Sequence, residues 1–138
     1  MTRNGIALKA AVVVGIVAAF GIGIAVGQQT APTENQGVKV SPATALDLAG
    51  ELDSVAGRQL RMRIVSVEPG GHVALHSHSG RPGIAYVAHG AITEHREGSG
   101  TMVRHEGDSF TEGTSTVHWA ENLGDKPVVI IAVDLFKP

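Results

Sequence analysis

Cysteine is absent from this chain of 138 residues, which excludes disulfide bonds and thiolate metal sites. Any bound metal would have to use imidazole, carboxylate or water ligands. Aromatic residues make up only 4% of the chain and no run of Lys or Arg occurs, so no nucleic-acid partner is expected. No serine lies in a nucleophile elbow, and no glycine-rich loop has the phosphate-binding pattern. Catalysis by paired carboxylates stays open, although no spacing indicates it.

Charge is also absent between Lys9 and Glu34, and residues 10–27 are apolar almost throughout. As a helix this segment would span about 27 Å, close to the hydrocarbon thickness of a bilayer. Arg3 and Lys9 precede it, which predicts a cytoplasmic N-terminus and export of the rest of the chain. The length favours an uncleaved membrane anchor over a cleaved signal peptide, although Ala25 and Gly27 would suit a cleavage site. A buried core helix is the remaining alternative.

The residues beyond this segment divide into a linker and one domain. Residues 28–37 are polar and contain Pro and Gly, which is typical of a short tether. We therefore expect a signal anchor or signal peptide over 1–27, a tether over 28–37 and a folded domain over 38–138. The domain would lie on the extracytoplasmic side of a membrane, or would be periplasmic or secreted if the signal is cleaved.

The domain is predicted to be all-β, because short stretches of alternating polarity are separated by glycine turns. Residues 41–52 are the one segment that could form a helix, with Ser41 as its N-cap. A turn is expected at residues 69–71. The last apolar segment, 127–136, is expected to be buried on both faces. The expected strands cover residues 58–68, 72–78, 83–90, 91–98, 101–107, 108–113, 115–122 and 127–136.

All seven histidines fall between residues 72 and 118. His76 and His78 are two residues apart, so a strand would direct both side chains to one face. With His118 from a neighbouring strand they would form a three-nitrogen cap for a divalent transition metal such as Fe, Mn, Ni, Cu or Zn. Such a cap leaves coordination positions open for water or substrate. From spacing alone, solvated or structural histidines are an equally valid interpretation.

Two motifs resemble those of the cupin superfamily. In the first, G-x5-H-x-H-x(3,4)-E-x6-G, the matching residues are Gly70, His76, His78 and Gly90. In the second, G-x5-P-x-G-x2-H-x3-N, they are Gly107, His118 and Asn122, whereas Gly113 and Ser115 replace Pro and Gly. The resemblance covers about residues 58–136. It implies a double-stranded β-helix, or jelly-roll barrel, with a metal site inside one mouth.

The resemblance departs from the family pattern at Gly83, which occupies the position of the glutamate ligand. It therefore implies three metal ligands, His76, His78 and His118, with Glu94 or Glu112 as substitutes for the missing carboxylate. Three-histidine cupins include iron enzymes such as thiol dioxygenases and diketone-cleaving enzymes, so the resemblance favours a small-molecule oxygenase. The alternative is a module that binds a small ligand or a metal without turnover. A homodimer is compatible with one anchored helix per chain.

Other polar residues near the motifs have two interpretations each. Arg81 lies in the bend beside the histidines and would bind a substrate carboxylate, or is an exposed loop residue. His72 shares strand parity with His76 and is a candidate cavity residue. His89 is expected to be structural, and His95 and His105 to be solvated. Parity also places Ala85, Val87 and His89 inside and Ile84 and Tyr86 outside, with Trp119 directed away from the metal.

Overall fold

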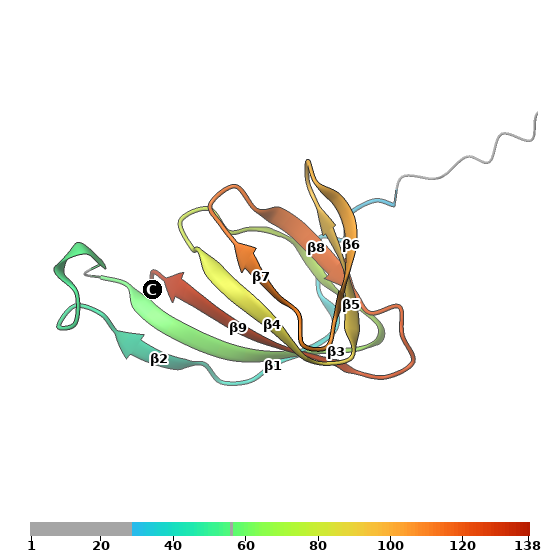
Figure 1. Cartoon of the computed structure of the whole chain (residues 1–138), viewed down its shortest axis with the longest axis horizontal. Coiled ribbons are helices and arrows are strands. Elements are labelled where there is room, and N and C mark those ends of the chain that lie inside the picture. Colours follow the sequence, from blue (N-terminus) through green and yellow to red (C-terminus); the bar gives the residue numbers. More distant parts are fainter. Residues whose placement is uncertain (1–28, 56) are drawn as a thin grey trace, which may run out of the picture.

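The computed structural model describes residues 29–55 and 57–138. Apart from one short 3-10 helix, η1 (Asp53–Val55), every regular element in these ranges is a β-strand, as predicted (Figure 1). The strands are β1 (Gln36–Val40), β2 (Thr44–Asp47), β3 (Gln59–Ser77), β4 (Gly83–His89), β5 (Ala91–Arg96), β6 (Gly100–His105), β7 (Ser109–Glu112), β8 (Val117–Glu121) and β9 (Val128–Phe136). The predicted anchor or signal, 1–27, lies outside the described residues. Within them, no helix has the length and hydropathy to span a membrane.

The strands form a nearly closed antiparallel barrel in the order β6-β5-β8-β3-β9-β4-β7, with β1 and β2 also paired to β3 (Figure 1). β3 belongs to both halves of the barrel, because its first part pairs with β9 and its last part with β8. The predicted turn at 69–71 is wrong, since a single strand of 19 residues runs through it. Gly70 has a φ of 72°, which bends the strand without ending it. This bend carries β3 from one half of the barrel to the other.

The predicted helix over 41–52 is also wrong, because this segment pairs with the start of β3. Ser41, the expected N-cap, instead exchanges two hydrogen bonds with Ile64: its Oγ accepts from the Ile64 amide and its own amide donates to the Ile64 carbonyl. β2 follows, with Leu46 opposite Leu60. Non-local pairing therefore overrides the local helix signal. Upstream, the expected tether 28–37 ends within β1, and Asn35 Oδ1 accepts a hydrogen bond from the Ala74 amide of β3.

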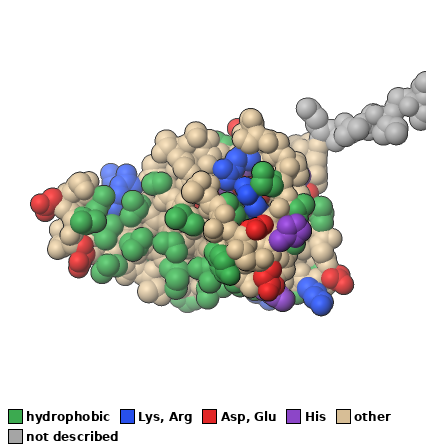
Figure 2. All heavy atoms as spheres, viewed as in Figure 1, with side chains coloured by type: hydrophobic (Ala, Val, Ile, Leu, Met, Phe, Trp, Pro, Cys, Tyr) green, Lys and Arg blue, Asp and Glu red, His purple; other side chains and the backbone are tan. Residues whose placement is uncertain are grey.

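One face of β3, β4, β5, β7, β8 and β9 lines the barrel interior, whereas β2 is exposed along its whole length. Ala85 and Val87 of β4 are buried while Ile84 and Tyr86 are exposed, which confirms the parity predicted for these four residues. His89 was predicted inside but is exposed, because the β4–β9 register shifts between Val87 and His89. The core cluster consists of Val67, Ala85, Val87, Ile92, Phe110, Val128 and Ile130. β9 was expected to be buried on both faces, but only alternate residues are buried. Large hydrophobic side chains stay exposed on the outer face of β3 and β4, among them Met62, Ile64 and Ile84, and Figure 2 shows hydrophobic side chains gathered over this part of the surface.

Candidate metal centre

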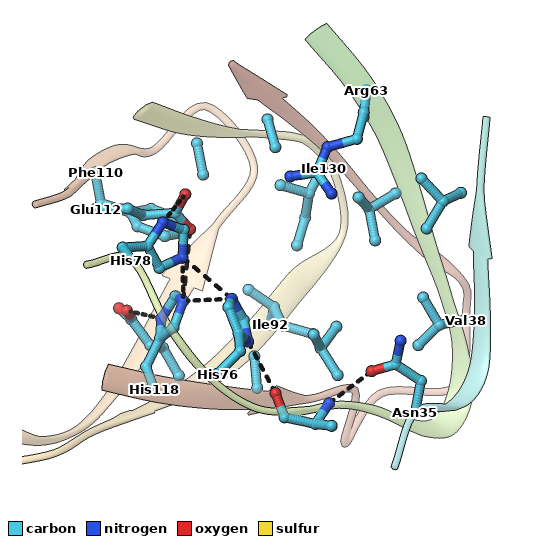
Figure 3. A pocket seen from close by; sticks show the side chains of 18 of the residues that line it. Asn35, Val38, Arg63, His76, His78, Ile92, Phe110, Glu112, His118 and Ile130 are labelled. Atoms are coloured by element: carbon cyan, nitrogen blue, oxygen red, sulfur yellow. Dashed lines mark hydrogen bonds and ion pairs between the residues drawn. The ribbon is translucent and has the colours of Figure 1, made fainter. Parts of the chain in front are cut away.

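The three predicted ligands meet at one end of the barrel interior (Figure 3). His76 lies directly opposite His118 in the antiparallel pair β3–β8. His78 follows the end of β3, where its amide donates a hydrogen bond to the Thr116 carbonyl. The Nε2 atoms of the three rings are 3.1 Å from one another in every pair.

Each ring is held by an oxygen atom at its other nitrogen. His76 Nδ1 lies 2.8 Å from the Ala74 carbonyl, and His78 Nδ1 lies 3.3 Å from the Arg81 carbonyl. His118 Nδ1 lies 2.7 Å from Glu94 Oε1. A carbonyl or carboxylate oxygen only accepts, so Nδ1 carries the proton in all three rings. The three Nε2 lone pairs then face one another without a proton between them, which is an arrangement that a cation stabilises.

The dimensions of this cluster fit a transition metal. Bonds of about 2.1 Å from three nitrogens spaced as these are would subtend about 95° at a shared ion, close to an octahedral face. Burial lowers the pKa of His78 to about 4 and that of His76 below its ordinary value. Both rings are therefore neutral and ready to ligate at pH 7.

Glu94 supports the site from behind His118. Its side chain is 2% exposed and accepts hydrogen bonds from His118, Arg96 and Arg104. Burial alone would raise the pKa of Glu94, but these hydrogen bonds lower it to about 2. The group is therefore an ionised carboxylate that fixes the His118 tautomer. The sequence placed Glu94 near the site but gave no direction for its side chain.

Gly83, the position of the family glutamate, has no space for a side chain. A Cβ atom there would lie 2.7 Å from the Val133 carbonyl oxygen and 3.1 Å from Asp134 Cβ. Glu112 lies opposite Gly83 in the β4–β7 pair and lines the cavity beside the histidines. Its carboxylate oxygens are 3.6 Å from His118 Nε2 and His78 Nδ1, and burial raises its pKa.

A cavity of 370 Å³ adjoins the histidines, and its walls are mostly apolar (Figure 3). Val38, Val65, Phe110 and Ile130 contribute to these walls. Arg63 lies across the cavity from the three histidines (Figure 3). The site therefore combines a three-nitrogen cluster, an apolar chamber and a cationic group at its far end.

The remaining predicted site residues are placed differently from one another. Arg81 lines the cavity, but its Nη1 donates a hydrogen bond to Asp134 at 2.8 Å. His72 does not line the cavity, because the β3–β8 register shifts between Val73 and His76 and brings Val73 inward instead. The sequence gave no partner for Asp134, since the strands that surround it are distant in the chain.

The other histidines lie outside the cavity. His89 and His105 are exposed, and His89 Nδ1 is 3.1 Å from a Glu106 carboxylate oxygen. The prediction that His95 is solvated is wrong. His95 stacks on Trp119 with ring centroids 3.8 Å apart, and its Nε2 donates to Glu121 at 2.8 Å. Strand pairing between β5 and β8 brings these residues together.

Comparison with solved structures finds several similar barrels. A predicted oxalate decarboxylase of Thermotoga maritima is 23% identical, with a TM-score of 0.55 over 77% of this chain and 93% of that one. A cupin sugar phosphate isomerase of Silicibacter pomeroyi is 20% identical, with a TM-score of 0.54 over 77% and 73%. Oxalate decarboxylase of Lactobacillus farciminis, in a formate complex, is 24% identical, with a TM-score of 0.57 over 78% of this chain and 31% of that one.

These similarities establish the fold, and a family match is more specific. A search of curated proteins finds no match. The cupin domain family matches residues 63–134, which include both histidine motifs and more than half of the chain. The protein therefore belongs to the cupin family.

Proposed function

We propose that the protein binds a divalent transition metal through His76, His78 and His118 and uses it on a small molecule held in the adjoining cavity. The observation that carries this proposal is the set of three Nε2 lone pairs 3.1 Å apart, with all three Nδ1 protons committed elsewhere. A bound metal would supply Lewis-acid or redox chemistry to an oxygenated substrate, and a small-molecule oxygenase fits the three-nitrogen ligand set. The metal among Fe, Mn, Ni, Cu and Zn is left to experiment.

The chain's own residues prepare the site. Glu94 holds the His118 ring so that its Nε2 faces the cluster. The apolar walls exclude water around a ligand, which strengthens every polar interaction in the cavity. Two of the similar structures are described as oxalate decarboxylases, which supports small carboxylic acids as the first substrates to test.

A binding module without turnover is the second candidate. The observation in its favour is Gly83, which leaves the cluster without the carboxylate ligand of the family motif. Oxygen consumption with small thiols and diketones, together with carbon dioxide release from oxalate, separates the two candidates. Turnover that disappears in His76→Ala supports the enzyme, whereas metal loading without turnover of any of them supports the module.

Metal analysis tests the shared part of both candidates. The full chain, purified without a histidine tag, is expected to contain close to one metal ion per chain. His118→Ala should lose it, while His105→Ala, which removes an exposed histidine, should retain it. A folded protein that takes up none of Mn, Fe, Co, Ni or Zn would refute the proposal.

The export of the domain is a separate proposal that rests on the apolar segment 10–27 and the positive charges before it. We expect the chain to fractionate with membranes and the domain to be accessible to protease from the extracytoplasmic side. Recovery of the whole chain from the cytoplasmic fraction would contradict it.

A further inference from the structure

Three arginines, Arg61, Arg63 and Arg81, surround the single carboxylate of Asp134. Arg63 lies across the cavity from the histidines (Figure 3), whereas the Arg81 carbonyl is 3.3 Å from His78 Nδ1. Arg61 and Arg81 each donate to Asp134 at 2.8 Å, and Arg63 donates to it at 3.1 Å. Burial alone would raise the pKa of Asp134, but the hydrogen bonds from Arg61 and Arg81 lower it. One negative charge therefore faces three positive charges, and the cluster keeps an excess of positive charge.

Arg63 and Arg81 each donate to Asp134 through one nitrogen, and of the two Arg63 is the one that lies across the cavity from the histidines. Its Nε is buried and has no hydrogen-bond partner among the described residues. Leaving a buried donor unpaired costs about 1–3 kcal/mol, more for a charged group. Arg63 also lines the cavity, whereas Arg61 does not and instead stacks on the Phe136 ring at 3.7 Å. The Nη1 of Arg63 makes no hydrogen bond among the described residues, so an anion in the cavity can bind Arg63 through Nη1 without displacing Asp134 from Nη2.

We infer that Arg63 binds the carboxylate of a small organic acid whose apolar body lies against Val65, Phe110 and Ile130. This inference rests on the proposed function at one point only: the other end of the ligand would approach a metal held by the three histidines. Guanidinium N–H groups match a carboxylate in geometry and charge, and the apolar walls favour a hydrocarbon body over a sugar or a phosphate ester. The ligand class is therefore a short carboxylic acid with a branched or cyclic hydrocarbon part.

Titration calorimetry with 3-methylbutanoate tests this inference on the full chain, both metal-free and loaded with zinc. The neutral 3-methylbutanamide has the same shape and serves as the ligand control. We expect the acid to bind metal-free protein, the amide to bind at least 10-fold more weakly, and Arg63→Gln to weaken the acid by about 10–100-fold. Arg61→Gln is the matched protein control, because it removes another positively charged partner of Asp134 that does not line the cavity. It should change the affinity for the acid less than 3-fold.

The outcomes separate this inference from the proposed function. Equal affinity of wild type and Arg63→Gln for the acid, or no binding at all, overturns the inference. Binding that requires zinc and ignores Arg63 also overturns it, while the metal site stands. Acid binding through Arg63 in a chain that takes up no metal supports the inference and refutes the metal site. Zinc content and circular dichroism of each variant show that it is folded.

Discussion

Replacing Glu94 by Gln should weaken metal binding without removing a metal ligand. The carboxylate lies 2.7 Å from His118 Nδ1 and is 2% exposed, so its charge acts on the ring with little screening by water. Loss of a carboxylate that hydrogen-bonds to a metal-ligating histidine lowers metal affinity by about 10–100-fold, which is about 1.4–2.8 kcal/mol. A glutamine oxygen still accepts the Nδ1 proton, so the lower half of this range is expected, about 10–30-fold.

The same substitution should destabilise the metal-free fold. Hydrogen bonds from His118, Arg96 and Arg104 hold the pKa of Glu94 at about 2, below its value of 4.5 when unfolded. A lowered carboxylate pKa contributes stability above the unfolded value and loses it as pH falls toward 2. At pH 7 the contribution is on the order of 3 kcal/mol. Urea unfolding of Glu94→Gln should show a loss of this size.

Competition with a chromophoric chelator measures the affinity, at a temperature where circular dichroism shows both proteins folded. Glu121→Gln is the matched control, because Glu121 accepts from His95 at 2.8 Å in a carboxylate–histidine pair outside the cavity. It should leave metal affinity unchanged. Equal affinities for wild type and Glu94→Gln would refute the role assigned to this carboxylate, as would an equal loss in both variants.

Three further predictions concern the stability of the metal-free protein in urea. Burial lowers the pKa of His78 to about 4, so the unfolded chain takes up more protons below pH 6.5; the fold should lose about 1–2 kcal/mol between pH 7.5 and 5.5, and a flat or rising profile would contradict this. Gly83→Ala should cost about 1–3 kcal/mol because its Cβ would meet the Val133 carbonyl, whereas Gly113→Ala, with open space around it, should cost less than 1 kcal/mol. Asn122→Ala should lower the free energy of unfolding by about 2–4 kcal/mol, because this fully buried side chain donates to two carbonyls and accepts from one amide. Its metal affinity should stay within 3-fold of wild type. An unchanged free energy of unfolding would refute the structural role of Asn122.

The sequence was sufficient to predict the barrel and its histidine cluster, because strand parity and motif spacing are local properties. His76 and His78 share a face, and His118 lies where the second motif implies. Features that depend on register were not accessible. The shift between Val73 and His76 reverses the parity that placed His72 inside.

Arg63 and Asp134 illustrate the same limit for charged residues. They are 71 positions apart in the chain and meet because β3 pairs with β9. Neither a composition nor a period of two identifies such a pair. The helix prediction for 41–52 failed for a related reason, because the helix signal is local in the sequence whereas the pairing of this segment with β3 is not.

The carboxylate network behind His118 extends from the barrel interior to its outside. Arg96 and Arg104 come from the hairpin of β5 and β6, and each side chain is about one-fifth exposed. Substitutions on this hairpin would change the charge that His118 experiences while every group in contact with a ligand stays in place. The strength of metal retention can thus vary among relatives, or be tuned by design, from the exterior of the molecule and independently of what the cavity accepts.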